Sequence, residues 1–131
     1  MAVSNYFQLQ AFPQGEGLSK AHGIFVKLNS SGAIVKTQAA TDAVVGVVII
    51  SLPYDSTDSK NCPGVCCERG VKVPAVASGA ISVGDMVALA ANGRIAKATS
   101  GTLIGVATEA AAVAGDVITI LFTGSFTKAA A

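Results

Sequence analysis

The sequence contains no tryptophan and few charged residues. Charged side chains make up 13% of its 131 residues and aromatic side chains 5%, whereas a typical soluble domain has about 25% charged residues. The formal net charge is +1, so we expect no basic patch for nucleic acid or an anionic membrane. Because 51% of the residues are hydrophobic, the composition argues against disorder. It favours either a protein that covers much of its exterior against other subunits or one that tolerates a surface with few charges.

The chain also lacks a long hydrophobic run. The longest strongly apolar stretch, residues 43–50, is far shorter than the roughly 18 residues that a membrane-spanning helix needs. The N-terminal sequence MAVSNYFQLQAFPQ has neither the basic nor the apolar region of a secretory signal. We therefore expect no membrane association, and synthesis in the cytoplasm with reduced thiols.

What the sequence does contain is an internal repeat. Residues 23–47 (GIFVKLNSSGAIVKTQAATDAVVGV) align with residues 84–106 (GDMVALAANGRIAKATSGTLIGV). Each copy has two alternating apolar runs around an Asn- and Gly-containing turn, followed by a strand of small residues. Period-2 alternation around such a turn is typical of a β-hairpin, because Asn and Gly tolerate the positive φ of a tight reversal.

The repeat predicts an all-β fold, a compact β-barrel or sandwich built from two pseudo-symmetric hairpin repeats with an inserted loop. Two copies in a chain of this length indicate a single domain. The expected segments are an N-terminal strand or arm with a loop (1–22), repeat 1 (23–51), an inserted surface loop or extended hairpin (52–69), repeat 2 with a closing strand (70–124) and a C-terminal tail (125–131). Pro74 predicts that its strand lies at a sheet edge or bulge.

Two Gly-Asp pairs precede expected strands, at residues 84–85 and 115–116. Gly permits the turn conformation, and Asp is expected to accept hydrogen bonds from neighbouring backbone amides. Such turns and two similar halves also fit the architecture of biotinyl and lipoyl carrier domains. Those domains need a modified Lys at a hairpin tip, and neither expected tip (29–32, 91–93) contains one.

The three cysteines, Cys62, Cys66 and Cys67, lie together in the expected inserted loop. An odd number does not make a self-contained disulfide framework, and structural zinc needs four ligands. Adjacent cysteines in an extended segment point to opposite sides. We therefore predict no metal and no cofactor, with an intersubunit contact or a disulfide after oxidation as the alternatives for these thiols.

No catalytic constellation is expected. His22 is the only histidine, and a general base would need a nucleophile and an orienting acid beside it. Gly15-Glu16-Gly17 lacks the further glycines and the lysine of a phosphate-binding loop. Lys36 and Lys97, equivalent in the two repeats, are predicted to be outward-facing strand residues. The sequence therefore predicts that the protein is not an enzyme.

The second half of the chain resembles the capsid decoration, or head cement, proteins of tailed bacteriophages. The resemblance covers residues 74–124 and rests on ISVGD, the strand leading into the ANG hairpin, LIGVATEAA, and AGD before a closing strand. It extends more loosely to the first repeat, and the segment 52–69 lies outside the pattern. These motifs are turn and core residues, so they carry no catalytic residue with them.

The resemblance implies a structural protein on the outer capsid surface of the virion, made in the cytoplasm of a host bacterium. It implies the major capsid protein as partner, self-association as a homotrimer, and no binding of nucleic acid or membrane. The expected contact surfaces are the N-terminal segment and the inserted loop. The residues concerned are Tyr6, Phe7, Leu9, Tyr54, Cys62, Cys66, Cys67 and Arg69.

Two other functions are open to the sequence. One is a carbohydrate- or host-surface-binding β module displayed on a virion, although sugar binding usually uses aromatic faces and this chain has only two Tyr and five Phe. The other is a hydrolase with a cysteine nucleophile and His22, which would require an activated thiolate beside a base.

Overall fold

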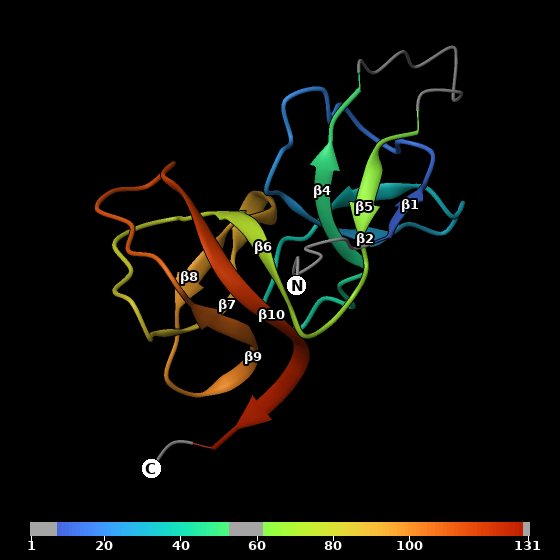
Figure 1. Ribbon diagram of the computed structural model, residues 1–131. Coiled ribbons are helices and arrows are strands. Elements are labelled where there is room, and N and C mark those ends of the chain that lie inside the picture. The colour runs from blue at the N-terminus through green and yellow to red at the C-terminus, as the bar shows by residue number, and fades with distance from the viewer. Residues whose placement is uncertain (1–7, 53–61, 130–131) are drawn as a thin grey trace, which may run out of the picture.

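A computed structural model describes residues 8–52 and 62–129 (Figure 1). These residues form two five-stranded antiparallel sheets, which confirms the predicted all-β fold. One 3-10 turn, η1 (Ala91–Gly93), is the only helical element in this part of the chain. No helix in these two ranges is long and apolar enough to span a membrane. The strands are β1 (Leu9–Ala11), β2 (Phe25–Leu28), β3 (Ile34–Lys36), β4 (Gly46–Ile50), β5 (Gly64–Cys66), β6 (Val71–Val76), β7 (Met86–Leu89), β8 (Ile95–Lys97), β9 (Gly101–Ala107) and β10 (Val117–Lys128).

The two sheets repeat one topology. Their strand orders are β1-β5-β4-β2-β3 and β6-β10-β9-β7-β8, so each strand of the first sheet has its counterpart five strands later. The loop hydrogen bonds repeat as well: Gly23 N–H donates to the Val48 carbonyl at 2.8 Å, and Gly84 N–H donates to the Ala107 carbonyl at 2.8 Å. The structural repeat therefore includes β1 and β5 and is longer than the repeat visible in the sequence.

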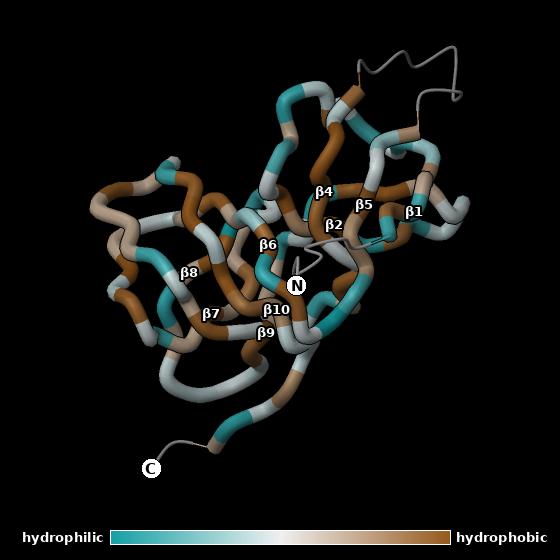
Figure 2. Tube along the Cα trace, in the orientation of Figure 1, coloured by the Kyte–Doolittle hydropathy of each residue, from teal (hydrophilic) through white to brown (hydrophobic). Residues whose placement is uncertain are grey.

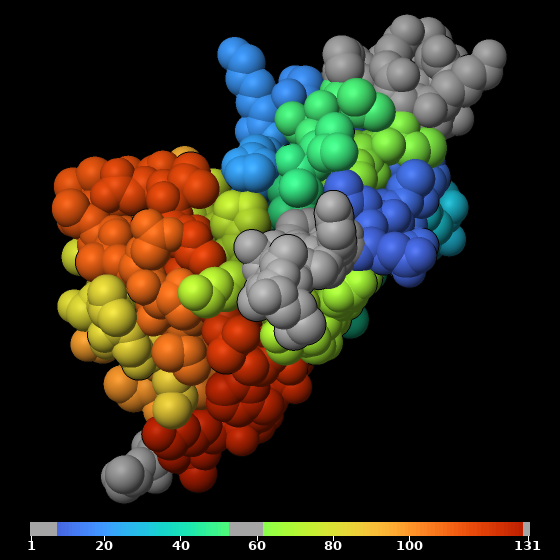
Figure 3. Space-filling view, viewed as in Figure 1, coloured from blue at the N-terminus to red at the C-terminus, as the bar shows by residue number. Residues whose placement is uncertain are grey.

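Each sheet also closes on itself. Shortly after β1, Gln14 forms a parallel bridge with Ile34 of β3, and directly after β6, Ala77 forms one with Ile95 of β8. The first and last strands of each sheet thus meet, and each half becomes a small barrel whose edges are partly sealed. We call residues 9–52 and 62–66 the first barrel and residues 71–128 the second barrel; they form two lobes (Figures 1 and 3).

The two barrels share a core. One cluster of buried side chains combines Phe25, Val47 and Cys66 of the first barrel with most of the buried residues of the second. The rings of Phe25 and Phe122 meet edge to face, with centroids 5.3 Å apart. A second cluster fills the first barrel and includes Val76 from β6. Hydrophobic residues accordingly follow the strand interiors of both lobes (Figure 2), and burial of this apolar surface drives folding.

The η1 turn joins the second barrel to the first. Gly93 N–H donates to the carbonyl of buried Thr37 at 2.7 Å, and Asn92 N–H donates to Gln38 Oε1 at 3.0 Å. Gly93 has a positive φ of 71° and is buried against the backbone of Phe25. The hairpin of one barrel thus packs directly on the strands of the other.

The segment expected as an inserted loop, residues 52–69, contains strand β5. Cys66 pairs with Leu9 of β1 and with Val47 of β4, so β5 lies inside the first sheet as the counterpart of β10. The antiparallel pairing of β4 with β5 agrees with the extended-hairpin alternative for this segment. The strand itself was not assigned from the sequence, because Gly64-Val65-Cys66 is short and stands among prolines and cysteines. Residues 53–61 lie outside the described part of the chain.

The expected C-terminal tail is also partly strand. β10 continues to Lys128, and its last part pairs with Gly101–Leu103 of β9 after a register shift between Phe122 and Phe126. Small and polar residues here form backbone hydrogen bonds that hydrophobic patterning does not reveal. Pro74 lies in β6, opposite Thr119 of β10. β6 is at one end of the strand order of its sheet, as predicted for a proline, which has no backbone N–H to donate to a neighbouring strand.

Arg69 ties the connection between the barrels to both of them. Its guanidinium donates to the carbonyls of Cys67, Val44 and Val45 at 2.6, 3.2 and 3.3 Å. The guanidinium carbon also lies 4.2 Å from the ring centroid of Phe122. A planar group that satisfies three carbonyls and stacks on an aromatic ring cannot be replaced by a simple ammonium.

We therefore expect Arg69→Lys to reduce the free energy of unfolding by about 1–2 kcal/mol, through lost hydrogen bonds and ring stacking. Urea unfolding followed by circular dichroism measures this change. Lys72→Ala, which removes an exposed cation on neighbouring β6, should change stability by less than about 0.5 kcal/mol. Equal losses in both variants would contradict the role given to Arg69.

Candidate functional site

Cys66 and Cys67 point into different cores, as expected for adjacent residues of an extended segment. Cys66 is fully buried in the cluster shared by the barrels, and Cys67 packs against the cluster inside the first barrel. Burial raises the pKa of both thiols, so neither is an activated thiolate. The prediction of Cys66 as a surface contact is wrong, because its side chain is not exposed in this chain.

The other chemical candidates are dispersed. Cys62 is half-buried. His22 is exposed, with Nδ1 2.8 Å from the Ile49 carbonyl oxygen, so Nδ1 carries the proton that it donates there. Within residues 8–52 and 62–129, no three His, Cys, Asp or Glu side chains come together as a metal site.

The remaining predicted contact residues divide into two groups. Tyr6, Phe7 and Tyr54 lie outside the described residues. Leu9 is half-buried and packs against the shared core, and Arg69 is exposed but its guanidinium is engaged within the chain. Among the predicted residues that are described, none therefore presents a large, unengaged apolar side chain on the surface.

The Gly-Asp turns form as predicted. Gly84 and Gly115 have φ values of 88° and 95°. Asp85 Oδ2 accepts the Ser82 N–H at 2.8 Å, and Asp116 Oδ2 accepts the N–H groups of Ala112 and Val113 at 2.9 and 3.2 Å. Side-chain acceptors that satisfy several backbone donors fix the shape of a turn.

These two turns build an exposed apolar surface that the sequence reasoning missed. Ile81 and Ala111 exchange backbone hydrogen bonds at 2.8 and 2.9 Å, and Gly115 N–H donates to the Ala77 carbonyl at 2.8 Å. The turns thus form one unit, at the end of the second barrel far from β1 (Figure 1). We call its exposed apolar residues the apolar tip: Ala80, Val83, Ala110, Ala112, Val113, Ala114 and Val117.

The apolar tip holds the three most exposed large hydrophobic side chains of the described residues. Val83, Val113 and Val117 are 66%, 61% and 55% exposed, and the hydrophobic colouring of Figure 2 extends over these turns. Apolar side chains held on a rigid support suit a contact with another protein, since little conformational entropy is lost on binding. The sequence signal was present in SGAISVG and EAAAVAG, two turns with apolar residues where polar ones are usual.

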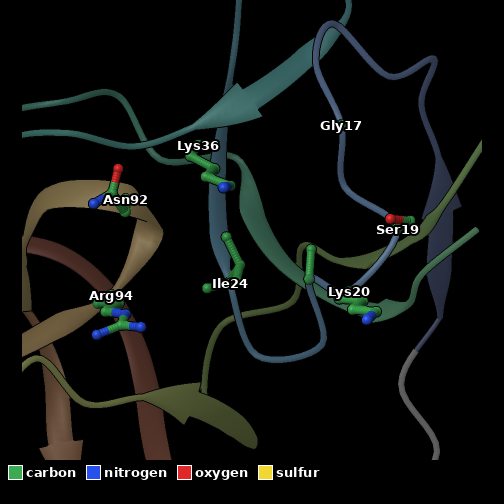
Figure 4. A pocket seen from close by; sticks show the side chains of 8 residues that line it. Gly17, Ser19, Lys20, Ile24, Lys36, Asn92 and Arg94 are labelled. Carbon is green, nitrogen blue, oxygen red and sulfur yellow. The ribbon is translucent and has the colours of Figure 1, made fainter. Parts of the chain in front are cut away.

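A pocket of about 520 Å³ lies between the barrels. Its lining residues come from the loop before β2, from β3, and from the η1 turn and the residue that follows it: Gly17, Ser19, Lys20, Ala21, Ile24, Lys36, Asn92 and Arg94. In Figure 4, Asn92 and Arg94 lie on one side, Ser19 and Lys20 on the other, and Ile24 between them. Three of the eight residues are cationic.

A scan against models of protein families finds no match for this chain, and a search of curated proteins finds none.

Proposed function

We propose that this protein is a structural component of a phage virion that binds the outer surface of the capsid and stabilises the lattice of the major capsid protein. The observation that carries the proposal is the rigid apolar tip. Three valines more than half exposed would be an aggregation liability on a free protein, but they suit a surface that becomes buried in an assembly.

The rest of the molecule supports a scaffold role. Two closed barrels with a shared core, few charges and hydrogen-bonded turns give a compact body that resists unfolding. The resemblance of residues 74–124 to capsid decoration proteins points to the same class of protein. Repetition of one contact over a capsid lattice, or within the homotrimer that the resemblance implies, would make weak individual contacts strong in sum.

We place the capsid contact at the apolar tip, in addition to the N-terminal segment and the part of segment 52–69 that lies outside β5. Val83→Asp and Val113→Asp should each weaken capsid binding at least about tenfold, because each puts a charge into an apolar interface. Co-sedimentation of the protein with undecorated capsids, assembled from the cognate major capsid protein, measures the bound fraction.

Leu28→Asp is the matched control, since Leu28 is 46% exposed on the first barrel and outside the apolar tip. We expect this variant to bind capsids like the wild type. Wild-type binding by both tip variants would remove the tip from the interface. Binding of the protein to glycans, with none to capsids, would favour a carbohydrate-binding module instead.

A further inference from the structure

We propose that the pocket between the barrels binds a small multivalent oxyanion, of the chemical class of pyrophosphate and organic phosphates. Its volume of about 520 Å³ lies in the range of about 300–1,000 Å³ usual for small-molecule sites. The site is separate from the apolar tip, so the proposal stands or falls independently of capsid binding.

The first observation is that the pocket is lined by cationic side chains without a neutralising carboxylate. Lys20, Lys36 and Arg94 line the pocket, and no acidic residue does. The ion pairs formed among residues 8–52 and 62–129 are Lys27–Asp42 and Lys97–Asp85, so the three pocket cations take part in neither. Cationic groups gathered in a concavity attract an anion more strongly than the same groups on a flat surface.

The second observation comes from the repeat. In the second barrel, Lys97 Nζ lies 3.7 Å from Asp85 Oδ1. The equivalent residues of the first barrel are Lys36 and Ile24, and both line the pocket. An apolar residue thus stands where the other barrel has the neutralising carboxylate, which leaves Lys36 available to a ligand. The prediction that both lysines are plain outward-facing residues missed this difference.

The third observation is that both barrels supply ligand-binding groups. Lys36 is half-buried in β3 of the first barrel, and half-buried Arg94 follows η1 in the second. Ser19 and Asn92 add neutral hydrogen-bond donors at opposite sides (Figure 4). Glu16 Oε1 accepts the backbone N–H of Lys36 at 3.0 Å, but Glu16 does not line the pocket.

An arginine and two lysines match a ligand with several anionic oxygens. The guanidinium binds two oxygens of one phosphate group in a fork, whereas each lysine acts as a point charge. A monovalent anion would leave at least one cation unused. A long polyanion is not favoured, because the chain carries a formal net charge of only +1 and the cations are gathered in one pocket.

The test is calorimetric titration of the full chain with sodium pyrophosphate at low ionic strength, combined with amide chemical shifts. We expect saturable binding, with the largest shifts at Lys36, Asn92 and Arg94. Lys36→Gln and Arg94→Gln should each weaken binding at least about tenfold, because each removes a charge-assisted contact. Added salt should weaken it too.

Lys97→Gln is the matched control: it removes the repeat-equivalent lysine outside the pocket and should bind pyrophosphate like the wild type. Thermal melts of all three variants verify that they are folded. Three outcomes would overturn the proposal: no saturable binding at millimolar pyrophosphate, unchanged affinity in both pocket variants, or equal losses in Lys97→Gln. Preferential binding of a single-stranded oligonucleotide or an acidic peptide would overturn the assignment of ligand class.

Discussion

Gly105→Ala and Gly46→Ala are expected to be the most damaging single substitutions in this chain. A Cβ atom on Gly105 would overlap the carbonyl oxygen of Leu121 in β10, and one on Gly46 would overlap that of Cys66 in β5. Both obstacles are backbone atoms inside hydrogen-bonded sheets, which cannot rotate away as a side chain can. The two positions are equivalent in the repeat, so both barrels contain the same close approach of a glycine to the backbone of a neighbouring strand.

Each of these two variants should lose at least about 3 kcal/mol of stability, a large share of the roughly 5–15 kcal/mol that holds a domain folded. Urea unfolding, or failure to recover soluble protein, measures the loss. Gly79→Ala is the control, because no atom lies within 4 Å of the added Cβ. A near-wild-type midpoint for both Gly46→Ala and Gly105→Ala would contradict the close approach of these strands.

The loss of stability in Gly93→Ala should have two contributions, one from backbone strain and one from lost packing between the barrels. Gly93 has a φ of 71°, and an added Cβ would lie 2.7 Å from the Phe25 carbonyl oxygen and overlap the Ile24 side chain. The positive φ costs an L-residue about 1 kcal/mol. Displacement of the η1 turn from β2, with loss of the Gly93–Thr37 hydrogen bond, should raise the total to about 3 kcal/mol.

Gly32 is the natural control for Gly93, since it holds the same position in the first hairpin. Its φ is 80°, and no atom lies within 4 Å of an added Cβ. Gly32→Ala should therefore cost only the backbone term of about 1 kcal/mol. Comparison of the two urea midpoints measures the packing term. Equal losses of stability in Gly32→Ala and Gly93→Ala would show that the η1 turn does not pack against the first barrel as described.

The strands that the sequence predicted correctly are those with strong alternation. Val26 and Val87, with Ile34 and Ile95, mark the two hairpins, and all four side chains are buried. These positions combine period-2 patterning with Gly-containing turns, which is the information that local sequence carries best.

The parts that could not be predicted depend on backbone pairing between distant segments. Gln14 and Ala77 close the two barrels through main-chain bridges, and Cys66 corresponds in the fold to Leu121 without any likeness of side chain. Main-chain hydrogen bonds do not specify residue type, so such pairings leave little trace in the sequence. The closure of each sheet into a barrel could therefore be seen only in the structure.

The candidate sites divide in the same way. The apolar tip could have been found from valine and alanine in the Gly-Asp turns, because apolar turn residues are unusual. The pocket brings together Lys20, Lys36 and Arg94, which are far apart in the sequence. Its one local signal was the contrast between Asp85 and its repeat equivalent Ile24.

A cryo-EM reconstruction of undecorated capsids incubated with the purified protein tests the proposed function most directly. We expect ordered density on the outer capsid surface, at a fixed ratio to the major capsid protein, with the turns at residues 78–85 and 108–117 against the lattice. Capsids that remain bare at saturating protein would contradict a decoration role, and bound density with these turns facing solvent would contradict the contact assigned to the apolar tip.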